Sequence, residues 1–254
     1  MPPVTTLITG ASSGIGAELA RQLTARGEDV VLCARRVDRL EQLRASIVAE
    51  HPPRGVTVRA LDVTDEPEVF RVFREVAAAL PGGLDRVVVN AGIGHGAPIG
   101  SGQAAVNRDT VVTNVLGALA QTEAAMAIFR SQGHGHLVMV SSMSALRGMP
   151  KGMTAYAASK AFVAHLAEGI RSDVIGRDDL DITVTTVFPG YIRSEMTNRM
   201  GAPPPFLAET ATGAAGIVAA IDKGAATARI PAWPWRPLGT AMKLAPLSLI
   251  RRFS

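Results

Sequence analysis

The fold is decided by the stretch Thr5-Thr-Leu-Ile-Thr-Gly-Ala-Ser-Ser-Gly-Ile-Gly16 of this 254-residue chain. An apolar run from Val4 to Ile8 leads into glycines at 10, 14 and 16, and an amphipathic run begins at Ala17. This order predicts a strand, a tight turn and a helix, because glycine lets the backbone turn sharply and approach a ligand closely. The positive end of the new helix would face the turn, where a pyrophosphate fits. Glycines that serve packing alone are the alternative for this stretch by itself.

Apolar runs alternate with helical patterns along the rest of the chain. The strand-like runs are 29–34, 56–61, 86–90, 136–141, 182–188 and 226–230, and the helical patterns are 15–26, 37–50, 66–80, 104–131 and 155–175. This alternation predicts an α/β fold with a doubly wound parallel sheet of about seven strands and helices on both faces. The strands are almost continuously apolar, as expected when both faces of a sheet are covered.

Composition limits the class of protein. No charge-free apolar run reaches the length of a membrane span, so no spanning helix is expected. The first strand begins by Val4, which leaves no room for a signal peptide, and a cytoplasmic location is the default expectation. The single cysteine, Cys33, excludes an internal disulfide and is expected to be a small buried apolar residue.

The net charge of +4 is concentrated near the C-terminus. No acidic residue follows Asp222, whereas six basic residues do: Lys223, Arg229, Arg236, Lys243, Arg251 and Arg252. Without these six, the 26 basic residues leave 20 against 22 acidic ones in residues 1–222. The basic balance therefore describes a tail, and no nucleic-acid partner is expected.

The glycine spacing Gly-x-x-x-Gly-x-Gly differs from the common Gly-x-Gly-x-x-Gly fingerprint of dinucleotide-binding folds. It resembles the nucleotide loop of the short-chain dehydrogenase/reductase family. Further motifs follow in that family's order: Asn90-Ala-Gly92, Asn114, Ser141-Ser142, Tyr156-x-x-x-Lys160 and Pro189-Gly190. The resemblance covers residues 4–195 and implies a Rossmann-type oxidoreductase that uses a nicotinamide cofactor and acts on a small carbonyl or alcohol.

The resemblance implies a set of cofactor contacts along the carboxyl ends of the strands. Val89 replaces the first Asn of the family's Asn-Asn-Ala-Gly, and Ser194 stands where the family has a Thr that bonds the nicotinamide carboxamide. Ile192 is expected to contact the same amide through its backbone. The full set is Gly10, Ser12, Ser13, Gly14, Ile15, Gly16, Asp62, Val63, Asn90, Ala91, Gly92, Tyr156, Lys160, Pro189, Gly190, Ile192 and Ser194.

The end of the second strand predicts the cofactor. An acidic residue there would bind the adenine-ribose hydroxyls and select NAD. Ala34 occupies that place, and Arg35 and Arg36 follow. A guanidinium pairs with a 2′-phosphate in a bidentate way, so the sequence predicts NADP over NAD. The alternative is that both arginines form the solvated start of a helix.

Tyr156 and Lys160 predict the chemical centre. Their spacing places both side chains on one helix face, one turn apart. A nearby ammonium favours phenolate and lowers the tyrosine pKa, which lets the phenol exchange a proton near neutral pH. Taken alone, such a pair is more often an ordinary surface pair. The resemblance implies that Tyr156 transfers the proton, Lys160 holds the nicotinamide ribose, and Asn114 kinks its helix and holds a water through its backbone carbonyl.

The catalytic serine is predicted from the strand end. The separation of Ser142 and Tyr156 is one residue longer than is usual in the family, and strict counting lands on Met143, which has no hydroxyl. We therefore place the serine that hydrogen-bonds the substrate carbonyl at Ser142, with the extra residue in the loop 147–153. Ser144 is the alternative. His95, His134 and His136 have no Cys or carboxylate cluster around them, so they are expected to be loop histidines and not metal ligands.

The C-terminal part lies outside the resemblance. Residues 1–235 are expected to form one domain with a substrate lid at 191–222, where Met196, Met200, Phe206 and Leu207 suit an apolar pocket or a core. Residues 236–254 form a basic amphipathic tail, with apolar residues at helical spacing and a break at Pro246. The tail could lie on a membrane surface, on a neighbouring subunit or on its own core. The apolar residues of this pattern are Leu238, Met242, Ala245, Leu249 and Phe253.

Together these features predict an NADP(H)-dependent oxidoreductase that moves hydride between nicotinamide and a carbonyl or secondary alcohol of an apolar or lipid-like substrate. The resemblance also implies a homo-oligomer, a dimer or tetramer, formed through the long helices after the fourth and fifth strands. Two alternatives remain: a catalytically silent dinucleotide-binding sensor or scaffold, and an epimerase or dehydratase on the same fold.

Overall fold

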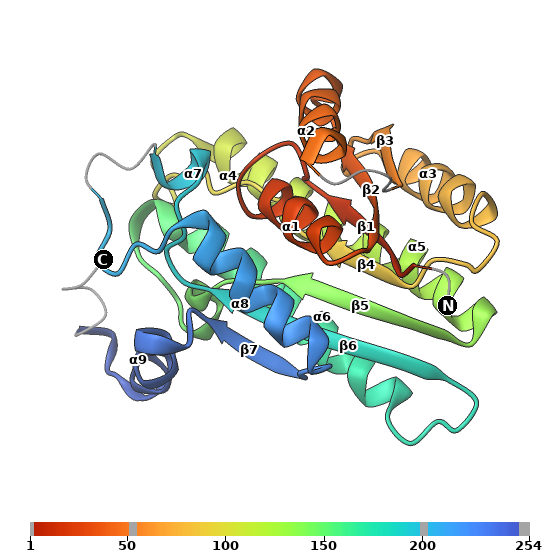
Figure 1. The fold of residues 1–254 in the computed structure, drawn as a ribbon. Helices are drawn as coiled ribbons and strands as arrows, with labels where there is room; N and C mark the ends of the chain where they lie inside the picture. Colours follow the sequence, from red (N-terminus) through yellow and green to blue (C-terminus); the bar gives the residue numbers. More distant parts are fainter. Residues whose placement is uncertain (1–2, 51–54, 199–202, 249–254) are drawn as a thin grey trace.

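The computed structural model describes residues 3–50, 55–198 and 203–248, and within them the chain forms one parallel sheet (Figure 1). Seven strands pair in the order β3-β2-β1-β4-β5-β6-β7 within the described residues. The strands are β1 (Thr5–Thr9), β2 (Asp29–Ala34), β3 (Val56–Ala60), β4 (Arg86–Val89), β5 (His134–Val140), β6 (Asp181–Pro189) and β7 (Thr227–Ile230). The predicted doubly wound sheet is confirmed.

Helices cover both faces of the sheet (Figure 1). One face carries α3 (Glu66–Ala78), α5 (Gly117–Gln132) and α6 (Thr154–Val174), and the other carries α1 (Gly14–Ala25), α2 (Val37–Glu50) and α8 (Thr210–Asp222). The remaining helices are α4 (Ala104–Val111), the π-helical η1 (Val112–Leu116), the short 3-10 turns η2 (Met143–Leu146) and η3 (Lys151–Met153), α7 (Glu195–Asn198) and α9 (Ala232–Leu244).

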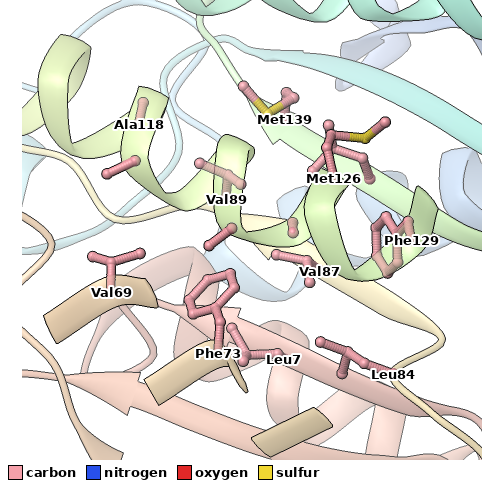
Figure 2. Close-up of a cluster of buried hydrophobic side chains, with 14 of the residues drawn as sticks. Leu7, Val69, Phe73, Leu84, Val87, Val89, Ala118, Met126, Phe129 and Met139 are labelled. Carbon is pink, nitrogen blue, oxygen red and sulfur yellow. The ribbon is translucent and has the colours of Figure 1, made fainter. Parts of the chain in front are cut away.

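The strands divide their side chains between two hydrophobic clusters. In β4, Val87 and Val89 belong to the cluster under α3, α5 and α6, whereas Val88 belongs to the cluster under α1, α2 and α8. Figure 2 shows the first cluster, in which Phe73 of α3 lies beside Leu7 of β1. Burial on both faces explains why these strands are almost continuously apolar.

The strand order creates a crevice at the carboxyl ends of β1 and β4. After β1 the chain crosses to β2 on one side, and β4 pairs with β1 on the other side. Ligands of such sheets bind at this point, where the direction of winding reverses. The residues that follow β1, β4, β5 and β6 therefore determine the site.

The predicted helix 104–131 contains a π-helical segment, η1, between α4 and α5. Asn114 lies inside η1, in agreement with a distortion of the helix at this residue. By length and composition alone, the continuous helix Ala104–Gln132 could cross a membrane, although no charge-free run of that length exists. Its inner face packs in the first hydrophobic cluster, as in a core helix.

The second half of the predicted lid is a core helix. Residues 210–222 form α8, whose Ala214, Ile217 and Ile221 are buried against α1 and the sheet. Only the segment before α8, with α7, remains at the mouth of the crevice. Its apolar candidates Met196 and Phe206 are exposed, and Met200 lies outside the described residues.

The tail does not begin at residue 236. Helix α9 starts at Ala232 and ends at Leu244, before Pro246, so it crosses the predicted boundary. Trp235 is buried, and Gly239 lies against Met143 and Leu146. One side of the described tail thus packs on η2, whereas Leu244 and Leu247 are exposed. The predicted tail residues Leu249, Arg251, Arg252 and Phe253 lie outside the described residues.

Candidate active site

The turn after β1 leaves no room for side chains. Gly10 and Gly14 have φ of 64° and 55°, values that favour glycine. A Cβ on Gly10 would lie 2.9 Å from Ala91 Cα, and one on Gly16 would lie 2.6 Å from the Gly10 carbonyl oxygen. Close packing therefore favours glycine at positions 10 and 16 and the backbone angle favours it at position 14, while Ile15 packs against the second cluster.

The turn is tied to the end of β4. The Asn90 side chain donates to the Thr9 carbonyl at 2.9 Å, and the backbone N–H groups of Asn90 and Ala91 both donate to Thr9 Oγ1 at 3.1 Å. These bonds fix the two strand ends that flank the crevice. Asn90, Ala91 and Gly92 thus lie at the carboxyl end of β4 beside the glycine turn, and their contact with a cofactor remains a prediction.

Arg36 lies against the glycine turn. Its Nη2 donates to Ser12 Oγ at 3.0 Å and to Ser13 Oγ at 2.8 Å, and its Nε donates to Ser12 Oγ at 3.2 Å. On its other side, Nη1 lies 3.0 Å from Glu195 Oε2, and Arg39 pairs with the second oxygen of the same carboxylate. Sequence reasoning missed Arg39 and Glu195, although Arg39 follows Arg36 at helical spacing.

Arg35 points to a different partner. Its Nη1 lies 3.9 Å from Asp62 Oδ2 in an exposed pair, and Asp62 Oδ1 accepts from the backbone and hydroxyl of Thr64. Val63 is buried in the first cluster, and both its carbonyl oxygen and its side chain lie beside Gly117 of α5. Of the two predicted arginines, only Arg36 contacts the glycine turn, through Ser12 and Ser13.

Asn114 holds the loop that follows β4. Its buried side chain accepts from the Ile93 N–H at 2.8 Å and donates to the Ile93 carbonyl at 2.8 Å and to Ser159 Oγ at 3.1 Å. A π-helical turn shifts the backbone hydrogen bonds of the helix by one residue and recurs at functional sites. The side chain of Asn114 therefore has a fixed structural task between the Gly92 loop and α6.

Ser142 and Tyr156 meet at the carboxyl end of β5. Burial and the nearby Tyr191 raise the pKa of Tyr156, whereas its hydrogen bond with the Ser142 side chain lowers the same pKa. Ser142 Oγ also accepts from the backbone N–H of Ser144 at 3.2 Å and from its hydroxyl at 3.0 Å. Ser142 is the serine in contact with the phenol, and Ser144 supports it.

Lys160 lies one turn below Tyr156 and is buried. Its Nζ donates to the Val140 carbonyl at 3.0 Å, and a Cβ on Gly92 would lie 3.4 Å from that Nζ. Burial lowers the pKa of Lys160 to about 8. The expected lowering of the tyrosine pKa by this ammonium is wrong for the protein alone: Lys160 is not among the causes that shift the Tyr156 pKa, and burial dominates.

The segment after β6 closes the site. A Cβ on Gly14 would lie 3.2 Å from Ser194 Cβ, so Ser194 lies beside the glycine turn, and its hydroxyl accepts from the Thr197 N–H at 3.4 Å. Ile192 is buried in the second cluster, and its backbone carbonyl accepts from Thr197 Oγ1 at 3.2 Å. An open cleft of about 410 Å³ lies here, lined by residues of the turn and of this segment, among them Ser12, Gly14, Arg193, Ser194 and Thr210.

An aromatic group flanks the predicted substrate side. The Trp235 ring packs on Gly190, at whose position any Cβ would overlap the indole. Tyr191 and Phe206 meet the same ring edge-on, with centroids at 5.7 Å and 6.3 Å. Sequence reasoning did not place Tyr191 or Trp235 in the site, because α9 meets the strand ends only through the tertiary fold.

The histidines differ from the prediction. His134 and His136 belong to β5 and are not loop residues, because the strand begins earlier than its apolar run. His136 contacts Thr185 Oγ1 at 2.9 Å, and burial lowers its pKa to about 4. Within the described part of the chain, no three His, Cys, Asp or Glu side chains cluster as a metal site would require.

The comparisons with known proteins agree with this geometry. A family model described as short chain dehydrogenase matches residues 4–204. An uncharacterised oxidoreductase of Mycobacterium tuberculosis is 46% identical over 248 residues, which cover 98% of this chain and 96% of that protein.

Two solved structures have the same fold. A short-chain dehydrogenase from Sphingobium yanoikuyae in complex with NADPH is 26% identical, with a TM-score of 0.80 over 99% of this chain and 96% of its own. A bulky-bulky ketone specific alcohol dehydrogenase from Comamonas testosteroni is 26% identical, with a TM-score of 0.78 over 100% of this chain and 96% of its own. With these matches, the chain belongs to the short-chain dehydrogenase/reductase family, whose members bind a nicotinamide cofactor, and it is an oxidoreductase of that family.

Proposed function

We propose that this protein is an NADP(H)-dependent oxidoreductase that interconverts a carbonyl and a secondary alcohol on an apolar or lipid-like substrate. The observation that carries the proposal is the contact of Ser142 with Tyr156, one helical turn above the buried Lys160, beside a crevice that opens onto the glycine turn. A protein that only senses or stores a nucleotide has no use for this arrangement.

The residues present fit a dinucleotide. Gly10 and Gly14 adopt left-handed φ angles that make the turn tight, and α1 begins at Gly14 with its N-terminus at that turn. Backbone N–H groups at a helix N-terminus suit a pyrophosphate. The bound cofactor would supply or accept the hydride. Gly10, Ser12, Ser13 and Gly14 would hold its phosphates, and Ile192 and Ser194 its amide.

Tyr156 is the proton-transferring group. In carbonyl reduction its hydroxyl gives a proton to the developing alkoxide, and in alcohol oxidation it takes the proton back. Ser142 donates a hydrogen bond to the same oxygen, which stabilises the charge that forms there. Burial raises the pKa of Tyr156, so the phenol is held protonated and ready to donate near neutral pH.

Lys160 and Asn114 support the proton transfer by Tyr156. Lys160 Nζ lies near Gly92 and would hold the nicotinamide ribose, and its pKa of about 8 lets it exchange protons close to neutral pH. Asn114 fixes the Gly92 loop through Ile93 and contacts Ser159 next to Lys160. The water that Asn114 would hold through its carbonyl links Lys160 to solvent in this scheme.

Arg36 supports the preference for NADP. Its guanidinium lies against Ser12 and Ser13, and Arg39 stands beside it, so two cations and two hydroxyls gather where a 2′-phosphate would lie. Ala34 is the last residue of β2 and is followed by Arg35 and Arg36, so an acidic residue that would select NAD does not stand at this position.

The aromatic group supports an apolar substrate. Tyr191, Phe206 and Trp235 gather on the side of the site that faces α9, and the partly exposed Met196 side chain lies beside Gly94 in the loop after β4. Aromatic side chains contribute large apolar contact areas and bind rings or chains edge-on or face-on.

Location and assembly belong to the same proposal. We expect a cytoplasmic homo-oligomer, and the exposed Trp233, Leu244 and Leu247 near the basic residues of α9 support contact with a membrane surface as the alternative. Pelleting with anionic liposomes tests this contact, and equal pelleting of wild type and a Trp233→Ser, Leu244→Ser, Leu247→Ser variant contradicts it.

The activity is tested by NADPH consumption against a panel of ketones, aldehydes and β-ketoacyl thioesters, repeated with NADH. We expect turnover with NADPH, a loss of at least about a hundredfold in Tyr156→Phe, and retained cofactor binding in that variant. Tyr191→Phe is the matched control, because it removes the only other phenol of the chain and keeps the ring.

Each alternative function has its own outcome. Full turnover in Tyr156→Phe contradicts the assignment of the proton donor. Cofactor binding without hydride transfer on any substrate supports the silent sensor or scaffold, and product formation without net NADPH consumption supports an epimerase or dehydratase.

A further inference from the structure

A carboxylate of the protein, that of Glu195, forms ion pairs with the two arginines beside the glycine turn. Glu195, the first residue of α7, pairs through Oε2 with Arg36 Nη1 at 3.0 Å and through Oε1 with Arg39. The two guanidinium groups hold the pKa of this carboxyl below its usual range, so Glu195 is an anion at neutral pH.

Arg36 keeps its place without Glu195. Three hydrogen bonds to Ser12 Oγ and Ser13 Oγ hold the guanidinium on the side opposite to the carboxylate. The anion position is therefore built by the glycine turn and the start of α2. Glu195 reaches it from a separate segment, which follows β6.

The contact is easily exchanged. The side chains of Glu195, Arg36 and Arg39 are 44%, 41% and 42% exposed, and exposed ion pairs contribute little to stability. A phosphate monoester carries up to two charges and three acceptor oxygens, and it can take both guanidinium groups from a single carboxylate.

We propose that Glu195 is an internal competitor for the 2′-phosphate of NADP(H), which must displace this carboxylate from Arg36 and Arg39 in order to bind. The inference rests on the proposed preference for NADP and deepens it. Glu195 directly follows Ser194, which lies beside Gly14, so the competing carboxylate belongs to the segment that borders the glycine turn. Glu195 weakens NADP(H) binding but has no such effect on a ligand without the 2′-phosphate.

The test measures binding of adenine-end fragments by calorimetric titration, independently of turnover. We titrate 2′,5′-ADP and 5′-AMP into wild type and Glu195→Gln. Removing the competitor raises the binding-competent fraction, so we expect 2′,5′-ADP to bind about three to ten times more tightly to Glu195→Gln, with 5′-AMP unchanged.

The matched control is Glu209→Gln. Glu209 is an exposed carboxylate that pairs with Arg193 near the same cleft and makes no contact with Arg36 or Arg39 among the described residues. The Glu209→Gln substitution removes the same formal charge as Glu195→Gln. A general electrostatic effect would therefore tighten 2′,5′-ADP binding equally in both variants. Equal tightening overturns the proposal.

Two further outcomes separate this inference from the proposed function. If wild type prefers 2′,5′-ADP over 5′-AMP and Glu195→Gln binds it no more tightly, or more weakly, Glu195 does not compete and the NADP preference stands. If wild type binds both fragments equally and turns over NADH in preference to NADPH, the proposed NADP preference is wrong, and so is the inference about Glu195.

Discussion

At the scale of the residue, Lys160 combines a necessary charge with a buried position. The residue is 6% exposed, and its ammonium has one hydrogen-bond acceptor, the Val140 carbonyl, among the described residues. Desolvation opposes the charged form, which is why the pKa falls from 10.5 to about 8. A lysine placed in this way reduces the stability of the fold while it serves the site.

This burial predicts a pH dependence of stability. Between about pH 8 and pH 10.5 the unfolded chain keeps a proton on Lys160 that the folded chain has lost, so the contribution of Lys160 to stability rises with pH in this window. Relative to Lys160→Met, the free energy of unfolding of wild type should rise by up to about 3 kcal/mol across it. Urea unfolding of both proteins at pH 7, 8, 9 and 10 measures this, and a constant difference contradicts the buried charge.

Replacing Asn114 should reduce both the stability and the activity of the protein. Asn114→Ala leaves the N–H and carbonyl of Ile93 without partners, which should cost about 2 to 4 kcal/mol of stability. Activity should fall further, because the same side chain positions Ser159 beside Lys160 and the Gly92 loop.

Asn107 supplies the control for this prediction. It accepts from the Ala97 N–H at 3.0 Å and donates to the Ala97 carbonyl at 3.0 Å, which is the same pairing in the same loop but away from Ser159. Asn107→Ala should lose stability and keep much more of the turnover in NADPH assays. Equal losses of turnover in Asn114→Ala and Asn107→Ala would contradict a role of Asn114 in activity beyond stability.

At the scale of the element, α9 is part of the site's wall. Trp235 lies on Gly190, and Arg147 donates to the carbonyls of Lys243 and Ala245 at the end of the helix. The residue after β6 must therefore be small, because the indole occupies the space where a Cβ would stand. This contact explains why the tail cannot be separated from the domain at residue 235.

The contact between Gly190 and Trp235 predicts that one added methyl group at position 190 reduces stability. Gly190→Ala places Cβ about 2.1 Å from Trp235 Nε1 and Cε2, so the indole must move, at a cost of about 1 to 3 kcal/mol. Trp235→Leu should relieve most of this cost in the double variant, as thermal unfolding would show. Gly169→Ala on α6 is the control, since a Cβ there meets nothing within 4 Å. Additive effects of the two changes would contradict the contact.

At the scale of the whole molecule, the helices that begin with α4 leave apolar side chains on the outside. Val111 is 41% and Leu116 is 55% exposed, on the continuous helix that the family resemblance assigns to subunit pairing. If the protein is an oligomer through this surface, Leu116→Glu should shift it toward monomer in sedimentation velocity. Val48→Glu, on α2 of the opposite face, should not. A shift in neither variant would place the interface elsewhere.

Much of the molecule could be predicted from the sequence because its signals are local. Glycine spacing, apolar strands and helical periodicity each follow from backbone geometry over a few residues, and together they predicted the parallel sheet that the structure has. The positions of Tyr156 and Lys160 on one helix face, and of Asn90 and Ser142 at strand ends, follow from the same short-range rules. The roles of these residues remain predictions that the proposed assays test.

Long-range packing determined the rest. The helical pattern of α8 does not tell whether its apolar face meets a substrate or α1, and only the fold buries Ile217 and Ile221 against the core. The spacing of Tyr156 and Lys160 suggested a lowered tyrosine pKa, but burial in the assembled site raises it. Glu195 lies far along the chain from Arg36 and Arg39, and Trp235 lies far from Gly190. Such contacts arise where separate strand ends and helices converge, so their charges and volumes act on each other only after the chain has folded.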